Sequence, residues 1–171
     1  MALYGRYTRN DELCQTNGYF SLNLRKGAVQ KIEEMLQLDE AATVAWVGCG
    51  DGRELLSIAK THPATYFDAF EINKSAIDIA QRVAQAEKLT NVRLHNIDFL
   101  THSPEKRFTH IYSTAIAGPE LYNRIFQACS QRVCVLKEMW VSGVGFSVEK
   151  SVTVHLMGSG EQRQLVCGDA D

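Results

Sequence analysis

Residues 44–53 read VAWVGCGDGR, and they decide the fold of this chain. An apolar run that favours a β-strand ends at Gly48, Gly50 and Gly52, and apolar residues at helical spacing follow Arg53. Glycine permits backbone angles and close approaches that a β-carbon blocks, and the start of the helix offers free N–H groups to a ligand. The stretch therefore predicts a ligand-binding loop, with an ordinary strand-to-helix turn as the alternative.

The spacing of the glycines separates two classes of ligand. A dinucleotide-binding loop has the pattern G-x-G-x-x-G, whereas Gly48, Gly50 and Gly52 form G-x-G-x-G. Arg53, at the next position, would crowd a pyrophosphate. The pattern therefore argues against a dinucleotide as the ligand.

Two acids follow the loop at the ends of predicted strands. Residues 66–72 predict a second strand ending at Glu71, whose carboxylate can accept hydrogen bonds from both hydroxyls of a ribose. Asp98 and Phe99 come after a short third strand at residues 92–94. The alternatives are that Glu71 caps the next helix or is solvated, and that Asp98 is an ordinary surface acid.

The rest of the chain alternates between helical and strand patterns. Helices are predicted at 22–38, 53–60, 74–88 and 121–129, and strands at 43–47, 66–71, 92–94, 109–114 and 132–136. Residues 148–157 and 162–167 flank Gly158-Ser159-Gly160, which predicts a hairpin. The expected fold is α/β and Rossmann-like: a doubly wound, mostly parallel seven-stranded sheet ending in an antiparallel hairpin, with helices on both faces. In such a sheet ligands bind beyond the carboxyl ends of the strands.

The loop and both acids resemble the cofactor motifs of the class I S-adenosylmethionine-dependent methyltransferases. The resemblance implies S-adenosylmethionine as the cofactor and S-adenosylhomocysteine as the product. It assigns the ribose to Glu71, the adenine amino group to Asp98 and ring stacking to an apolar neighbour, for which Phe99 matches. The implied cofactor-binding residues are Gly48, Cys49, Gly50, Gly52, Glu71, Ile72, Asp98, Phe99 and Ser113. We expect Glu71→Ala to weaken cofactor binding with little effect on folding.

Shorter patches resemble protein-lysine methyltransferases. Gly118-Pro119-Glu120 after the fourth strand, Asp98-Phe99-Leu100 and residues 19–24 are similar to segments of the Dot1-type histone-lysine enzymes. Gly50-Asp51-Gly52-Arg53 is similar to the small enzymes that methylate mitochondrial carriers and ATP synthase. This resemblance implies methyl transfer to a protein lysine, with Tyr19 and Thr114 as catalytic residues and Phe20 beside them in a substrate channel.

Two departures keep other functions open. Trp46 stands where most class I enzymes have an acid, and the basic extensions with which histone enzymes hold nucleosomes are absent. A small-molecule or RNA methyltransferase is therefore one alternative, and a non-catalytic S-adenosylmethionine-binding module is another.

Bulk properties set further limits. A chain of 171 residues suits one domain, here 21–171, preceded by an N-terminal lid or substrate segment at 1–20. A net charge of −2 argues against a strong nucleic-acid surface, and no apolar run reaches the length of a membrane span. No secretion signal is present, so we expect a cytoplasmic protein with its five cysteines reduced. The five histidines are scattered, so we expect surface or loop positions and no bound metal.

Overall fold

The described residues form one sheet with the strand order β3-β2-β1-β4-β5-β7-β6. The computed structural model describes residues 28–103, 105, 107–113, 119–136, 148–155 and 162–170. The strands are β1 (Thr43–Val47), β2 (Tyr66–Phe70), β3 (Val92–His95), β4 (Phe108–Ser113), β5 (Cys129–Leu136), β6 (Lys150–His155) and β7 (Gln162–Asp169). The first five pair in parallel, and β7 pairs antiparallel with both β5 and β6. The predicted fold class is confirmed.

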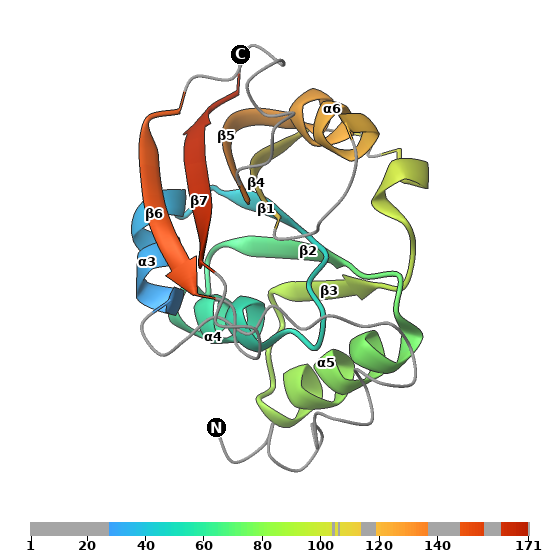
Figure 1. Ribbon diagram of the computed structural model, residues 1–171. Helices are drawn as coiled ribbons and strands as arrows, with labels where there is room; N and C mark the ends of the chain where they lie inside the picture. The colour runs from blue at the N-terminus through green and yellow to red at the C-terminus, as the bar shows by residue number, and fades with distance from the viewer. Residues whose placement is uncertain are drawn as a thin grey trace.

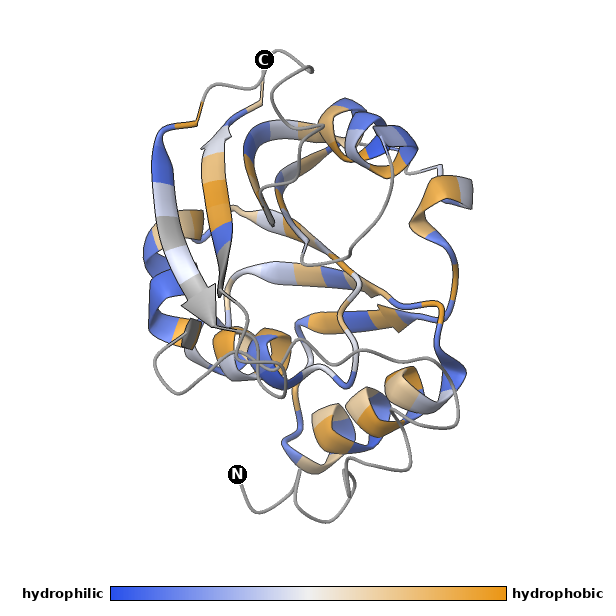
Figure 2. Cartoon of the chain, viewed as in Figure 1, coloured by the Kyte–Doolittle hydropathy of each residue, from blue (hydrophilic) through white to orange (hydrophobic). Residues whose placement is uncertain are grey.

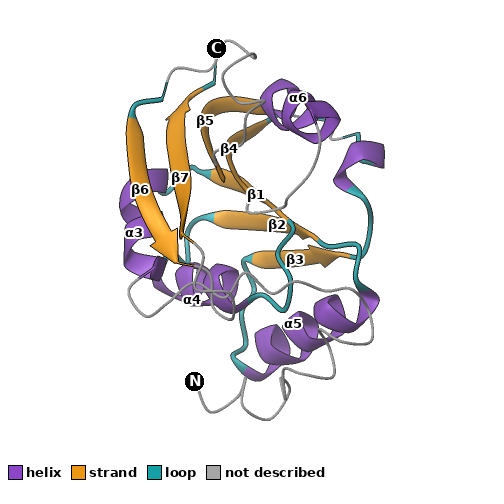
Figure 3. Ribbon diagram, viewed as in Figure 1, coloured by secondary structure: helices purple, strands orange, loops and turns teal. Residues whose placement is uncertain are grey.

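Helices cover both faces of the sheet, as Figures 1 and 3 show. On one face lie α3 (Ala28–Leu36), α4 (Arg53–Thr61) and α5 (Lys74–Ala86), and on the other lie α6 (Pro119–Ala128) and the short 3₁₀ turn η1 (Phe99–Thr101). Each helix has one buried side, which Figure 2 shows as alternating apolar and polar stretches along α4 and α5. Burial of these apolar sides against the strands is the main stabilising contribution to the fold.

Strand β1 contributes to two cores because successive residues of a strand point to opposite faces. Val44 and Trp46 pack with α3, α4 and α5, whereas Ala45 and Val47 pack with α6. A row of register partners crosses the first of these faces and consists of Ala69, Trp46, Tyr112, Cys134 and Cys167. The row links the strand that precedes the glycine loop to the antiparallel end of the sheet.

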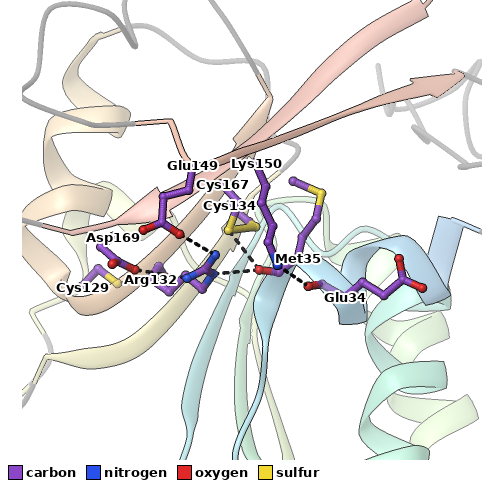
Figure 4. The surroundings of a disulfide bond; sticks show 9 residues. All are labelled: Glu34, Met35, Cys129, Arg132, Cys134, Glu149, Lys150, Cys167 and Asp169. Atoms are coloured by element: carbon purple, nitrogen blue, oxygen red, sulfur yellow. Dashed lines mark hydrogen bonds and ion pairs between the residues drawn. A yellow bond between two sulfur atoms is a disulfide. The ribbon is translucent and has the colours of Figure 1, made fainter.

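The junction of β5 and β7 is cross-linked covalently and electrostatically (Figure 4). Cys134 and Cys167 are directly opposite on the two strands, with Cα atoms 4.2 Å apart, and form a disulfide. The expectation of reduced thiols was therefore wrong for this pair, while Cys49 and Cys129 are free and buried. The expectation failed because only the strand register, which one sequence does not reveal, brings the two cysteines together.

Predicted and observed boundaries differ by a few residues. Helix α6 starts at Pro119, where the missing N–H and fixed φ of proline suit the first helical turn, and β5 begins directly after it at Cys129. The predicted helix at 22–38 is observed over Ala28–Leu36, and residues 22–27 lie outside the described residues. His110 is buried within β4, so the expectation that every histidine lies at the surface or in a loop was wrong.

Candidate functional site

The glycine loop turns the chain between the end of β1 and the start of α4. Gly48, Gly50 and Gly52 all have positive φ, at 74°, 57° and 80°, in the region that residues with a β-carbon rarely adopt. The backbone N–H groups of Gly48 and Cys49 both donate to the carbonyl of Phe70, at 2.8 and 3.2 Å. The loop is therefore held against the carboxyl end of β2, where the sequence predicted a ligand-binding edge.

Gly52 has a second requirement besides its backbone angle. A β-carbon at this position would lie 3.0 Å from the Ala80 β-carbon of α5 and 3.2 Å from a methyl group of Leu56. Both contacts are tight, so the third glycine permits close packing of the loop on α5. This role concerns the fold and needs no ligand.

Glu71 joins the glycine loop to the end of β2. Its carboxylate accepts hydrogen bonds from the N–H groups of Gly50, at 2.9 Å, and Asn73, at 2.8 Å. The residue is 8% exposed, and no cation contributes to these two bonds. Each carboxylate oxygen can accept more than one hydrogen bond, so capacity for ligand hydroxyls remains. Because Glu71 also organises the backbone, its removal is expected to reduce stability, contrary to the expectation from sequence.

Sequence reasoning missed two asparagines beside Glu71. Asn73 caps α5, since its side-chain oxygen accepts from the Ala76 N–H at 3.1 Å. The side-chain amide of Asn96 donates to the carbonyls of Glu71 and Ile72, at 2.9 and 3.1 Å. The cap has a sequence signal, an asparagine just before a helical pattern, but the Asn96 contacts depend on tertiary structure alone.

The two polar side chains inside the loop differ in their chemistry. Burial raises the pKa of the Cys49 thiol well above its usual value, and the nearby carboxylates of Glu71 and Asp51 raise it further. Cys49 therefore stays a neutral thiol and is unsuited to nucleophilic attack. Burial also raises the pKa of Asp51, although the Arg53 guanidinium, 2.9 Å away, opposes that shift.

Strand β4 ends beside the loop. The Ser113 hydroxyl donates to the carbonyl of Val47 at 3.0 Å, so this residue ties the end of β4 to the residue before Gly48. Trp46 and Tyr112 are neighbours in the row of register partners that crosses the sheet, and their ring centroids are 4.1 Å apart. The Tyr112 hydroxyl is buried and has no hydrogen-bond partner among the described residues, and burial raises the pKa of this phenol well above its usual value.

The segment after β3 has an exposed acid and a buried ring. Asp98 caps η1, because one of its carboxylate oxygens accepts from the Leu100 N–H at 2.9 Å. Phe99, which was expected to stack on an adenine ring, is only 3% exposed and packs in the core against Phe70. Among the described residues, the large apolar side chains exposed at this edge of the sheet are instead those of Ile72, Ile97 and Leu100.

This arrangement offers a loop that has no side chain at three positions, a carboxylate with spare acceptor capacity and an exposed apolar edge. The model of a family described as a methyltransferase domain matches residues 44–135, more than half of the chain. The chain belongs to the methyltransferase domain family. S-adenosylmethionine is the methyl donor of that family, so the chain carries a class I S-adenosylmethionine-dependent methyltransferase domain.

Other comparisons agree with the fold. The methyltransferase resembles a crystal structure of magnesium protoporphyrin IX methyltransferase from Synechocystis PCC 6803 with bound S-adenosylmethionine, at a TM-score of 0.70 and 11% identity, over 84% of this chain and 78% of that one. It also resembles an RNA methyltransferase from Salinibacter ruber in complex with S-adenosyl-L-homocysteine, at a TM-score of 0.67 and 18% identity, over 85% and 92% of the two chains. At these identities the likeness concerns the fold.

One curated relative is more similar in sequence over a short region. An uncharacterized protein of Rickettsia prowazekii (strain Madrid E), RP028, is 33% identical over 61 residues, or 36% of this chain. The matched region spans only 24% of that protein.

The residues present fit the family's cofactor. Glu71 is a buried carboxylate with acceptor capacity beside the loop, which suits ribose hydroxyls, and the positive-φ glycines leave the loop without side chains at three positions.

The predicted catalytic residues Tyr19 and Thr114, and Phe20 beside them, lie outside the described residues. Over the described part of the chain, no group of three or more histidine, cysteine or acidic side chains could hold a metal ion. None of the helices described has the length and apolar character that crossing a bilayer requires.

Proposed function

We propose that this methyltransferase transfers a methyl group to the side-chain amine of a protein lysine. The cofactor would bind across the carboxyl edge of the sheet, with its amino-acid end at Gly48–Gly52, its ribose on Glu71 and its adenine between Ile72 and Asp98. When bound, S-adenosylmethionine supplies an electrophilic methyl group and leaves as S-adenosylhomocysteine. The observation that carries the cofactor assignment is the Glu71 carboxylate, which is buried against the loop through the Gly50 N–H.

The chain's own task is to position the acceptor and keep it neutral. An amine attacks the methyl group only after losing its proton, and a dry channel favours that loss because burial disfavours the ammonium form. Tyr19, Phe20 and Thr114 are the proposed channel residues. The lysine assignment is supported by the sequence patches, of which Pro119 and Glu120 open α6 just after the exit of β4.

A labelling experiment tests the acceptor. The protein is incubated with cell extract and S-adenosylmethionine carrying a labelled methyl group, and the products are separated after nuclease or protease treatment. Label in protein that hydrolyses to methyl-lysine is the expected result, and the cofactor-site variant Glu71→Ala should lose most of it. Label found only in nuclease-sensitive or low-mass material would reject the lysine acceptor.

Small-molecule and RNA acceptors are the second candidates, because the similar solved structures are named for a porphyrin and for RNA. The same experiment distinguishes them by the fraction in which the label appears. A non-catalytic cofactor-binding role is the third candidate, because Trp46 replaces the usual acid before the loop. Calorimetry that detects S-adenosylhomocysteine binding, together with no labelled product from any extract, would favour this role.

A further inference from the structure

The turn that follows β3 is held by a cluster of aromatic rings. We use the term ring cluster for Phe70, His95, Phe99, His102 and Phe108. His102, which ends η1, has its ring centroid 4.7 Å from that of Phe70, 6.1 Å from Phe99, 6.2 Å from His95 and 6.5 Å from Phe108. Its ring therefore contacts the end of β2, the end of β3 and the start of β4 together.

The backbone of His102 also holds the turn that follows β3 in place. Its N–H donates to the carbonyl of Phe99 at 3.2 Å, which closes the turn, and its carbonyl accepts from the Arg124 guanidinium of α6. The other end of the same turn is Asp98, whose carboxylate caps η1. The position of Asp98 thus depends on the docking of a turn that is only three residues long.

Burial and two basic neighbours disfavour a positive charge on the His102 ring. His95 lies on β3 and is hydrogen-bonded to Asp68 of β2 at 2.7 Å, Arg124 lies on α6, and β4 offers only the apolar ring of Phe108. Burial lowers the pKa of His102, and His95 and Arg124 lower it further, while Asp68 acts in the opposite direction. The docked turn therefore suits a neutral imidazole.

We propose that His102 is a positioning residue for the adenine side of the cofactor site, whose neutral ring keeps Asp98 in place, so that cofactor binding weakens as the pH falls. The inference rests on the proposed function, in which Asp98 contacts the adenine. A protonated ring leaves the cluster, the turn undocks from α6 and β2, and the Asp98 carboxylate loses its fixed position.

The sign and size of the effect follow from proton linkage. A histidine whose pKa is lowered in the docked state contributes to docking above its ordinary pKa of 6.5, and that contribution is lost as the pH falls through this value. If the undocked ring titrates normally and the cofactor binds only the docked form, affinity falls by up to roughly tenfold per pH unit below that value. Between about pH 7.5 and about pH 5.5 the dissociation constant should therefore rise, by at most on the order of tenfold.

Calorimetry with S-adenosylhomocysteine at both pH values tests the inference, because this ligand has no group that titrates between them. The variants are His102→Phe, which keeps an aromatic ring without a proton to gain, and His102→Gln in case the bulkier ring disturbs packing. His110→Gln is the matched control, because His110 is a buried histidine in the row of Val44, on the face of the sheet opposite η1. Melting midpoints of the ligand-free proteins at each pH separate folding from binding.

The expected result is a pH dependence in the wild-type protein and in His110→Gln that is absent from His102→Phe and His102→Gln. Binding with the same pH dependence in wild type and both His102 variants would overturn this inference and leave the cofactor site intact. Absence of binding at either pH would reject the cofactor site and, with it, the role of His102.

Discussion

The glycine loop and the β5–β7 junction both bury charged side chains, but they satisfy them differently. In the loop, Glu71 accepts from two backbone N–H groups and keeps acceptor capacity. At the junction, Arg132 donates to the carbonyl of Met35 at 2.8 Å and to the carboxylates of Asp169 and Glu149 at 3.2 and 3.1 Å (Figure 4). A guanidinium has only donors, and here they are directed to acceptors on α3, on β7 and on the residue before β6.

This difference separates a site from a structural cross-link. Arg132 and the neighbouring disulfide connect β5 to β7, to the residue before β6 and to α3, so the groups at the junction are satisfied by one another. Glu71 connects one loop to one strand end and can take further partners. Substitutions at the junction should therefore change stability alone, whereas substitutions at the loop should change stability and cofactor affinity together.

The largest effect is expected from the disulfide. Replacing both Cys134 and Cys167 with alanine releases a link between residues 33 positions apart, which should reduce the free energy of unfolding by about 3–4 kcal/mol. Affinity for S-adenosylhomocysteine should stay the same. Urea denaturation measures the change, with Cys129→Ala, at a buried free cysteine, as the control. A double variant that unfolds at the wild-type urea concentration would contradict a bonded pair in solution.

Glu71→Ala should affect both properties. Loss of a charged acceptor costs about 1.5–3 kcal/mol, so affinity for the cofactor should fall roughly 10- to 100-fold. The free energy of unfolding should also fall by about 1–2 kcal/mol, because the N–H groups of Gly50 and Asn73 lose their acceptor. Calorimetry and urea denaturation of the ligand-free protein measure the two changes. A loss of stability with unchanged affinity would mean that Glu71 serves the loop only.

Arg132→Met should reduce stability by about 1–2 kcal/mol, because the Met35 carbonyl loses its donor. Asp169 and Glu149 are 65% and 45% exposed at their side chains, so both carboxylates can be hydrated and add little to the loss. The midpoint of urea unfolding should shift while the dissociation constant of the cofactor does not. A weaker cofactor affinity in the folded variant would show that the junction and the loop are coupled.

Tyr112→Phe should have the smallest effect and the opposite sign. Tyr112 lies in the row between Trp46 and Cys134, and within the described part of the chain its buried hydroxyl has no hydrogen-bond partner. Removing an unsatisfied buried hydroxyl should stabilise the protein by up to about 1 kcal/mol. Calorimetric melting of the ligand-free protein would detect a rise in the melting midpoint. A fall instead would mean that the hydroxyl has a partner in solution, such as a buried water.

The ligand-binding edge was predicted from local signals, and its details were not. Glycines at 48, 50 and 52 and acids at the predicted strand ends placed the loop, Glu71 and Asp98 at one edge of a parallel sheet. The burial of Phe99 was missed because two apolar residues in succession, Phe99 and Leu100, give no indication of which one faces the core. A 3₁₀ turn decides it, and that turn depends on contacts with Phe70 and α6.

The sequence by itself determined the order of strands and helices, the β1–glycine loop–α4 unit and the fold class, because strand and helix periodicity and glycine conformation act within a few residues of chain. Only the tertiary structure decided that Glu71 binds the Gly50 N–H, that Cys134 pairs with Cys167 and that His102 packs against three strands. The contacts of Glu71 with Gly50, of His102 with Phe70 and of Cys134 with Cys167 join residues 21, 32 and 33 positions apart, and the register of neighbouring strands, set by packing across the whole sheet, determines which residues meet.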